Sequence, residues 1–298
     1  MEKKTIRGRI MKIVIVPPYK GSNWIPEKGQ YMVRELIDNM RERGQLEGVE
    51  VDIDDGAPLP EKLDYQRQTL KSNSLDYMSV GVAERVRYYS DLGKHDAIVQ
   101  TGDLDPGFNT ARTVSTIPFV SAGHAGIHVA SLIGNRFTFF AMKDTSCMTV
   151  RRFVKDYGFD HKVISVRSSY TGSSSSVAYG KFAHMGSSSW RFLIRDYPNK
   201  EERFKLPESQ KIVKYLTDQC IAAIEKDRVD SIILGCPVIS VFEEVLRQSL
   251  DQAGYGEIPL IVSQYAAVEI AKTLVSMKLT QARRAYPTYE LKAAPEFR

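Results

Sequence analysis

The sequence predicts an α/β protein made of two similar halves, each a parallel sheet covered by helices. Short continuous apolar runs alternate with longer segments of helical spacing, the pattern of strand–helix–strand units. The pattern also repeats within the chain. The stretch DAIVQTG from Asp96 matches DSIILGC from Asp230, and TIPFVSAGHAGIHVA from Thr116 matches EIPLIVSQYAAVEIA from Glu257.

The individual elements follow from the apolar runs and the residues that interrupt them. The first run, KIVIV, stops at Pro17 and is short enough to be a buried strand. Strands are expected at residues 12–16, 49–53, 96–101, 117–120, 136–142, 161–166, 231–234 and 258–262. Helices are expected at residues 27–43, 79–92, 109–114, 124–133, 146–157, 207–226, 240–253 and 266–277.

The repeat pairs Gly102 with Cys236 and His124 with Tyr265, and it aligns two Ile-Pro pairs in the same order. Chance matching of apolar strands is the alternative explanation. The shared Ile-Pro and the matched small residues of the following helices favour duplication. A pseudo-twofold axis between the halves would place Gly102 and Cys236 on either side of one cleft.

The repeat divides the chain into parts. Residues 1–11 are expected to be an N-terminal extension, residues 12–134 the first half and residues 135–279 the second half. The segment 280–298 is a candidate to pack on the first half. An insertion at residues 168–206 is rich in Ser and Gly but also aromatic, so a flexible linker and a substrate-covering flap or subunit contact remain alternatives.

Composition narrows the function classes. The chain of 298 residues is 43% hydrophobic and 26% charged, and its formal net charge of +5 comes from scattered residues. Nucleic-acid binding would need a concentrated basic face. Three cysteines without metal-type spacing argue against a disulfide framework and a structural zinc site. No apolar run approaches the ~20 residues of a membrane span, and no signal core is visible, so a cytoplasmic protein is expected.

Cys236 is the strongest candidate for chemistry. An apolar run ends in Gly235-Cys236-Pro237 and is followed by a segment of helical spacing, so the cysteine falls where a strand turns into a helix. A thiol there can be partly exposed, and the helix dipole favours its thiolate. The alternative is a small buried hydrophobe, which is the interpretation for Cys147 and Cys220, both inside helical patterns.

Several blocks of the chain resemble one enzyme superfamily. They are DPGFNTAR from Asp105, HVASLIGNRF from His128, YGFDHKVISVR from Tyr157, DSIILGCPV from Asp230 and the tail from Ala266. Between residues 12 and 289 the chain is similar to the aspartate/glutamate/hydantoin racemases, most of all to their hydantoin and allantoin racemase branch. The resemblance implies two flavodoxin-like halves with the active site between them, a small-molecule substrate, no metal or organic cofactor, and a homo-oligomer.

The resemblance also implies a mechanism. Such racemases place one cysteine after the third strand of each half; one thiolate takes the α-proton and the other thiol returns a proton to the opposite face. Cys236 matches the second cysteine, whereas the first falls on Gly102. Among the neighbours of Gly102, Thr101 can donate a hydrogen bond, and Asp103 could exchange protons if burial raised its pKa. Asp103 could equally be a turn or capping residue.

The predicted function is a racemase or isomerase that acts on a small carboxylate or a hydantoin- or amide-type substrate, with Cys236 as acid/base and Asp103 as a second catalytic candidate. Alternatives stay open. The family's arylmalonate decarboxylases also have glycine at the first cysteine position and protonate with the second. A cysteine-nucleophile isomerase, a hydrolase and a non-catalytic binding protein are the others.

Substrate contacts are expected from backbone N–H groups and hydroxyls near helix N-termini. The candidates are Tyr19, Thr101, Gly102, Thr145, Ser146, Pro237, Val238, His124 and Tyr265. Pro237 has no N–H, so Val238 supplies the donor there. Two prolines precede Tyr19 and remove backbone N–H donors from that loop. One end of the substrate is therefore expected to bind differently, against Tyr19 or Trp24. His124 and His128 are four apart, but no third metal ligand is evident, so a metal site is disfavoured.

Overall fold

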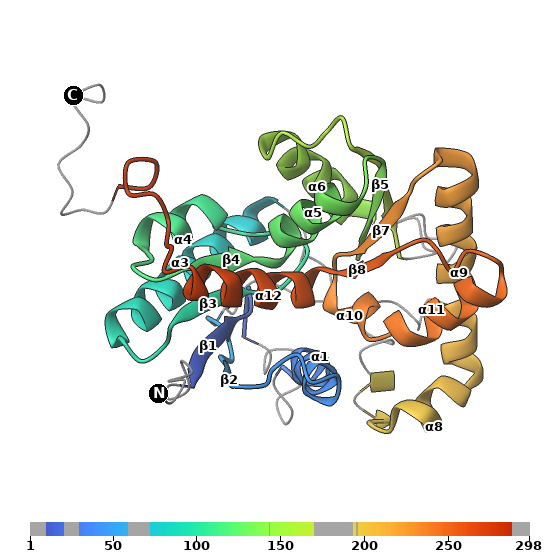
Figure 1. Cartoon of the computed structure of the whole chain (residues 1–298), viewed down its shortest axis with the longest axis horizontal. Coiled ribbons are helices and arrows are strands. Elements are labelled where there is room, and N and C mark those ends of the chain that lie inside the picture. The colour runs from blue at the N-terminus through green and yellow to red at the C-terminus, as the bar shows by residue number, and fades with distance from the viewer. Residues whose placement is uncertain are drawn as a thin grey trace, which may run out of the picture.

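The computed structural model describes residues 10–20, 30–58, 72–142, 144–169, 193–194 and 196–287. Trp24 and most of the insertion at 168–206 lie outside the described residues. Two four-stranded sheets carry the fold, one from each part of the chain (Figure 1). Within the described residues, no helix is long and apolar enough to cross a membrane.

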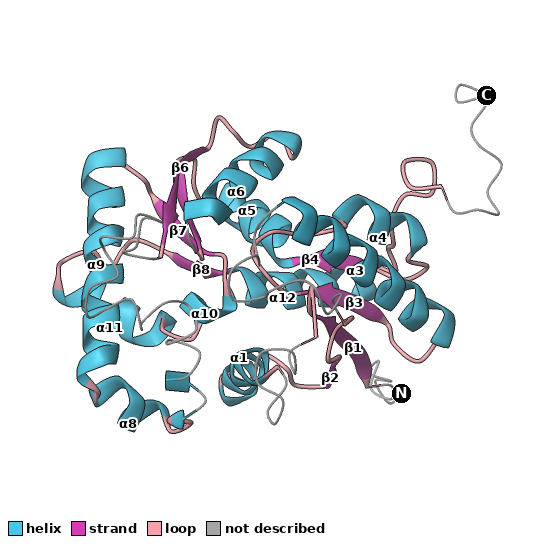
Figure 2. Ribbon diagram, turned by 180° about the vertical axis from the view of Figure 1, so that it is seen from behind, coloured by secondary structure: helices cyan, strands magenta, loops and turns pink. Residues whose placement is uncertain are grey.

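The first sheet has the strand order β2-β1-β3-β4, and all neighbouring strands are parallel. Its strands are β1 (Met11–Val16), β2 (Val49–Ile53), β3 (Ala97–Gln100) and β4 (Phe119–Ser121). Its helices are α1 (Tyr31–Glu42), α3 (Ser72–Leu92), α4 (Phe108–Val114) and α5 (Ala122–Ile133). The central strands β1 and β3 are mostly apolar, from Ile13 to Val16 and from Ala97 to Val99, because helices cover both faces of the sheet (Figure 2).

The second sheet has the matching order β6-β5-β7-β8, again parallel throughout. Its strands are β5 (Phe137–Ala141), β6 (Val163–Ser168), β7 (Ser231–Leu234) and β8 (Leu260–Val262). The helices are α6 (Asp144–Asp156), α8 (Lys200–Lys205), α9 (Pro207–Asp227), α10 (Pro237–Ser240), α11 (Glu243–Gln252) and α12 (Ser263–Ser276). The predicted α/β class with two similar parallel-sheet halves is therefore confirmed.

Matched residues of the internal repeat make matched backbone hydrogen bonds. The N–H of Ile98 donates to the carbonyl oxygen of Pro118 at 2.8 Å, and the N–H of Ile232 donates to that of Pro259 at 3.0 Å. Each bond joins the third strand of a sheet to the residue that leads into its fourth strand. The Ile-Pro pairs seen in the sequence thus occupy the same place in the two sheets.

The last helix of each half crosses to the other half. α5 follows β4 but contacts β7 and β8, while α12 follows β8 but contacts β3 and β4. The two helices also pack on each other between the sheets (Figures 1 and 2). Gly126 permits this approach, because a Cβ there would lie 2.4 Å from Ser263 Oγ and 3.1 Å from Ile233 Cγ2. One hydrophobic core therefore runs through both halves.

Some elements differ from the sequence-based expectation. The helix expected at 240–253 begins only at Glu243, as α11, and a separate short helix, α10, precedes it and ends at Ser240. α8 falls inside the expected insertion, where no helix is predicted. Beyond α12, the Gln281 side-chain amide donates to the Phe119 carbonyl at 3.0 Å, so this part of the chain lies on the first half.

Candidate active site

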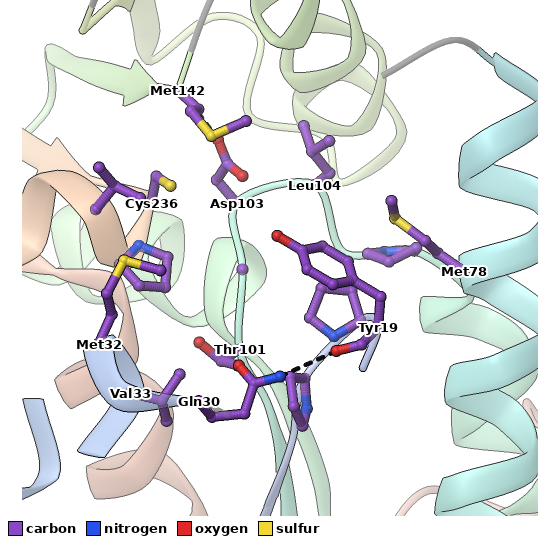
Figure 3. Close-up of a pocket in the computed structure, with 16 residues that line it drawn as sticks. Tyr19, Gln30, Met32, Val33, Met78, Thr101, Asp103, Leu104, Met142 and Cys236 are labelled. Carbon is purple, nitrogen blue, oxygen red and sulfur yellow. Dashed lines mark hydrogen bonds between the residues drawn. The ribbon is translucent and has the colours of Figure 1, made fainter. Parts of the chain in front are cut away.

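A cavity opens at the carboxyl ends of the central strands, where parallel α/β sheets hold their ligands. It encloses about 650 Å³ of space, including its open mouth. Its walls come from the segments after β1, β3, β5 and β7 and from α1 and α3 (Figure 3). The lining includes Tyr19, Gln30, Met32, Val33, Met78, Thr101, Gly102, Asp103, Leu104, Met142, Cys236, Pro237 and Val238. Gly102 and Cys236 thus share one cavity.

Cys236 lies directly before α10, whose first residue is Pro237. Its side chain is only 4% exposed, which is more buried than the sequence suggests, yet it lines the cavity. Its carbonyl accepts the N–H groups of Ile239 and Ser240, both at 3.0 Å. Cys147 and Cys220 are buried in the core as expected, and burial raises the pKa of Cys220 to about 12.

A buried polar network fixes the loop that carries Cys236. Gln264 of α12 donates its amide to the Gly235 carbonyl at 2.8 Å, and Ser240 Oγ donates to Gln264 Oε1 at 3.0 Å. A Cβ on Gly235 would lie 2.2 Å from Phe139 Cε1, so only glycine fits. The sequence gives no local signal for this network, since Gln264 and Ser240 are ordinary polar residues near helix starts.

On the first-half side of the cavity, Gly102 has a φ of +114°. The Thr101 side chain is 3% exposed, and its hydroxyl makes no hydrogen bond within the part of the chain that the structure describes. Asp103 is 6% exposed, and its Oδ2 accepts the N–H of Met142 at 3.0 Å. Because Met142 follows β5, this bond ties the loop of one half to the other half.

Tyr19 enters the cavity from the loop after β1 (Figure 3). Gln30 donates its amide to the Tyr19 carbonyl at 3.0 Å and to the Asp55 carbonyl at 3.1 Å. Gly56 packs against the same peptide, since a Cβ there would lie 2.3 Å from the Tyr19 carbonyl oxygen. Gln30 and Gly56 were not singled out by the sequence, because their roles depend on contacts between loops.

The structure does not bring His124 to the cavity. Its ring packs between Phe108, at 4.6 Å between centroids, and Tyr157, at 4.8 Å. Its Nε2 lies 3.0 Å from Nε2 of His128, and burial, with smaller contributions from His128 and Arg112, lowers the pKa of His124 to about 3. No group of three or more His, Cys, Asp or Glu side chains suited to a metal ion occurs among the described residues.

Three other predicted contacts also lie away from the cavity lining or outside the described side chains. Tyr265 lines a smaller apolar cavity, together with Thr101 and Gln264. Ser146, in the first turn of α6, is completely buried and is not part of the main lining. The Thr145 side chain is outside the described residues.

Asp105 has a structural role near the site. Its carboxylate accepts the N–H groups of Gly123 at 2.9 Å and His124 at 2.7 Å, and the Tyr157 hydroxyl at 3.0 Å. It therefore holds the start of α5, although it lies in another loop. Burial raises the pKa of Asp105, while these donors act in the opposite direction.

This chain is similar in sequence to a hydantoin racemase and in fold to two allantoin racemases. The hydantoin racemase of Pseudomonas sp. (strain NS671) is 24% identical over 219 residues, which cover 73% of this chain and 74% of the relative. Among solved structures, allantoin racemase from Klebsiella pneumoniae has a TM-score of 0.64 at 18% identity and covers 95% of this chain and 96% of its own. Allantoin racemase from Pseudomonas fluorescens gives the same TM-score and identity over 95% and 99%. These two structures share the fold of this chain.

A match to a protein-family model identifies the family of this chain. The model described as Asp/Glu/Hydantoin racemase matches residues 25–181, which is more than half of the chain. This match begins after β1, covers the rest of the first half with the loop of Gly102, and extends through β5 and β6 of the second. The chain therefore belongs to the Asp/Glu/hydantoin racemase family of enzymes.

Proposed function

We propose that this enzyme is a cofactor-independent racemase or isomerase that acts on a small hydantoin- or amide-type substrate or a small carboxylate, with Cys236 as its acid/base. The observation that carries the proposal is the position of Cys236. It follows β7 as Gly102 follows the matching strand β3, and both line one cavity between the halves. A thiol at this place can reach a substrate held across the pseudo-twofold axis.

The proposed reaction begins with proton removal from the carbon next to a carbonyl group. The Cys236 thiolate takes the proton, and the electrons of the C–H bond move onto the carbonyl oxygen to give an enolate. The hydroxyl of Thr101 is well suited to donate to that oxygen, because it is buried, lines the cavity and has its hydrogen bond unused within the described residues. Return of a proton to the opposite face completes the inversion.

Asp103 is the proposed second proton carrier. Its side chain lines the same cavity, beside Gly102, where the resemblance places the first thiol of two-cysteine racemases. Its hydrogen bond from Met142 also gives it a structural role between the halves. Replacement by asparagine keeps that geometry but removes proton transfer, so Asp103→Asn should retain stability while losing racemisation.

The walls of the cavity favour a neutral substrate with an apolar substituent. The side chains of Met32, Met78, Leu104 and Met142 present apolar surface to it. An anionic group would also meet the Cys236 thiolate that removes the proton, and like charges at close range repel. We therefore place the hydantoin- or amide-type substrate ahead of the carboxylate.

Solvent-deuterium exchange tests the proposal. Wild type, Cys236→Ala and the core control Cys147→Ala are incubated in D₂O with hydantoins, amino acids and aryl- or alkenylmalonates after dialysis against EDTA. Deuterium should enter the α-carbon with the carbon skeleton intact in wild type and Cys147→Ala. Loss of the acid/base should lower the rate in Cys236→Ala by roughly 10²–10⁴-fold. Exchange that persists unchanged in Cys236→Ala contradicts the proposal.

Decarboxylation is the second candidate, and Gly102 is the observation that favours it. With one thiol and a glycine at the other position, the site matches the pattern of the resembling arylmalonate decarboxylases. In that reaction a malonate would lose carbon dioxide, and Cys236 would protonate the resulting enediolate once. Loss of carboxylate with one deuterium gained identifies this reaction. If none of the compounds in this panel shows Cys236-dependent turnover, a cysteine-nucleophile enzyme or a binding protein is left.

A further inference from the structure

We infer that Gln264 is a positioning residue for the Cys236 thiol, through its hydrogen bond to the Gly235 carbonyl. The inference rests on the proposed function, because it concerns how that thiol is aligned with the substrate. Gln264 lies in the first turn of α12, is 5% exposed and does not line the main cavity. It therefore acts through the loop and does not touch the reacting atoms.

The hydrogen bond from Gln264 lies just beyond the last strand pair of the sheet. The pairing of β7 with β8 ends at Leu234 and Val262, because α12 begins at Ser263. The next residue, Gly235, faces β5, where its N–H donates to the Phe140 carbonyl, and its own carbonyl has no backbone donor within the described residues. A buried carbonyl without a hydrogen-bond partner destabilises the fold, and the Gln264 amide supplies the donor at 2.8 Å.

The peptide groups on both sides of Cys236 are consequently fixed. Before it, the Gly235 N–H donates to Phe140 at 3.1 Å while the Gly235 carbonyl accepts from Gln264. After it, the Cys236 carbonyl accepts the N–H groups of Ile239 and Ser240. Ser240 Oγ in turn donates to Gln264, so the side chain that holds Gly235 is itself held. Within this frame the thiol retains only rotation about its own side-chain bonds.

The two halves differ at the matching place. The repeat that pairs His124 with Tyr265 also pairs Gly123 with Gln264, and Gly123 has no side chain that could donate. Its N–H is instead used by Asp105. The half whose loop carries the thiol therefore has the glutamine, whereas the half whose loop carries Gly102 lacks it. A positioning role for the thiol predicts this difference between the halves. A general role in closing the sheet would instead require a glutamine in both halves.

The consequence for catalysis is large, because proton transfer depends on the alignment of the reacting atoms. A misplacement of about 1 Å can lower the rate by roughly 10²-fold. Alkylation by iodoacetamide makes no such demand, since the small reagent can orient itself around the thiolate. Loss of Gln264 should therefore reduce turnover much more than it reduces alkylation of Cys236.

The experiment compares wild type with Gln264→Met, Gln264→Glu and the matched control Gln281→Met. Gln281 is also buried, 7% exposed, and its amide also donates to a backbone carbonyl, but at Phe119, outside the cavity lining. For each protein we would measure kcat and KM for solvent-deuterium exchange, the iodoacetamide rate at Cys236 by mass spectrometry, and the melting temperature.

The inference predicts that kcat falls at least tenfold in both Gln264 variants, while KM and the alkylation rate of Cys236 change less than threefold. Gln281→Met should lose stability but keep kcat. Equal kcat in wild type and Gln264→Met overturns the inference and leaves the proposed function intact. Equal losses of kcat in Gln264→Met and Gln281→Met reduce Gln264 to a structural residue. Absence of Cys236-dependent exchange in wild type overturns the proposed function and, with it, this inference.

Discussion

Substitution of Gly102 by alanine separates two roles of this position. The φ of +114° lies in the region that side chains rarely adopt, whereas space is available, since the nearest atom to a new Cβ would be Pro18 Cγ at 3.5 Å. The cost should therefore come from the backbone and amount to about 1–3 kcal/mol of unfolding free energy. The added methyl group would also project toward the cavity and reduce the room for substrate.

Gly254→Ala is the matched control. Gly254 also has a positive φ, +88°, with no atom within 4 Å of a new Cβ, and it does not line the cavity. Thermal unfolding and urea denaturation should show comparable losses in both variants, with the melting temperature falling by about 2–4 °C per kcal/mol. Only Gly102→Ala should raise KM in the exchange assay.

Two results would refute this reasoning. If Gly102→Ala unfolds like wild type while Gly254→Ala is destabilised, then the backbone at residue 102 relaxes readily and its φ does not require glycine. If both variants lose stability but KM is unchanged in Gly102→Ala, then the methyl group does not face bound substrate. The second result would remove Gly102 from the proposed site.

Three further predictions concern stability and reactivity. His124 stays neutral in the folded state down to a pH of about 3 but titrates near 6.5 when unfolded. The unfolding free energy should therefore fall by about 1.4 kcal/mol per pH unit as the pH drops below 6.5. The substitution His124→Gln should flatten this slope in urea titrations at several pH values. Arg203→Met breaks the ion pair between the fully buried Arg203 and Glu35, and it should lower the unfolding free energy by about 3–5 kcal/mol because Glu35 keeps a charge without a partner. Adding Glu35→Gln removes that charge and should recover part of the loss in the same urea titrations. Iodoacetamide at pH 8 should label Cys236 before Cys220, whose raised pKa keeps it protonated; mass spectrometry showing the reverse order would contradict the placement of both thiols.

The strands were predictable because each is a local apolar run. Residues 49–53 and 231–234 were expected as strands, and the structure has the same bounds for β2 and β7. The separate short helix α10, and the start of α11 only at Glu243, could not be predicted from the periodicity of residues 240–253. The crossing of α5 and α12 to the opposite halves could not be predicted either. It depends on which sheet each helix packs against, and the apolar pattern of a helix does not specify that sheet.

The site was predictable where residues follow strand ends. Cys236, Gly102, Thr101, Asp103 and Tyr19 were all expected near substrate, and all line the cavity. Residues that reach the cavity or its loops from elsewhere in the chain were missed. The methionines at 32 and 78 look like ordinary apolar positions in the sequence, and the bond of Gln264 to the Gly235 carbonyl joins positions 29 apart.

The crossing of the two last helices bears on how such a chain can arise. A single half with this topology is self-complementary: two copies related by a twofold axis would each cover the other's sheet, as in a symmetric homodimer. In that dimer any substitution after the third strand would appear on both sides of the substrate. Fusion into one polypeptide removes this constraint. One copy can then keep a cysteine where the other carries Gly102, so covalent linkage is what allows the proposed site to become asymmetric.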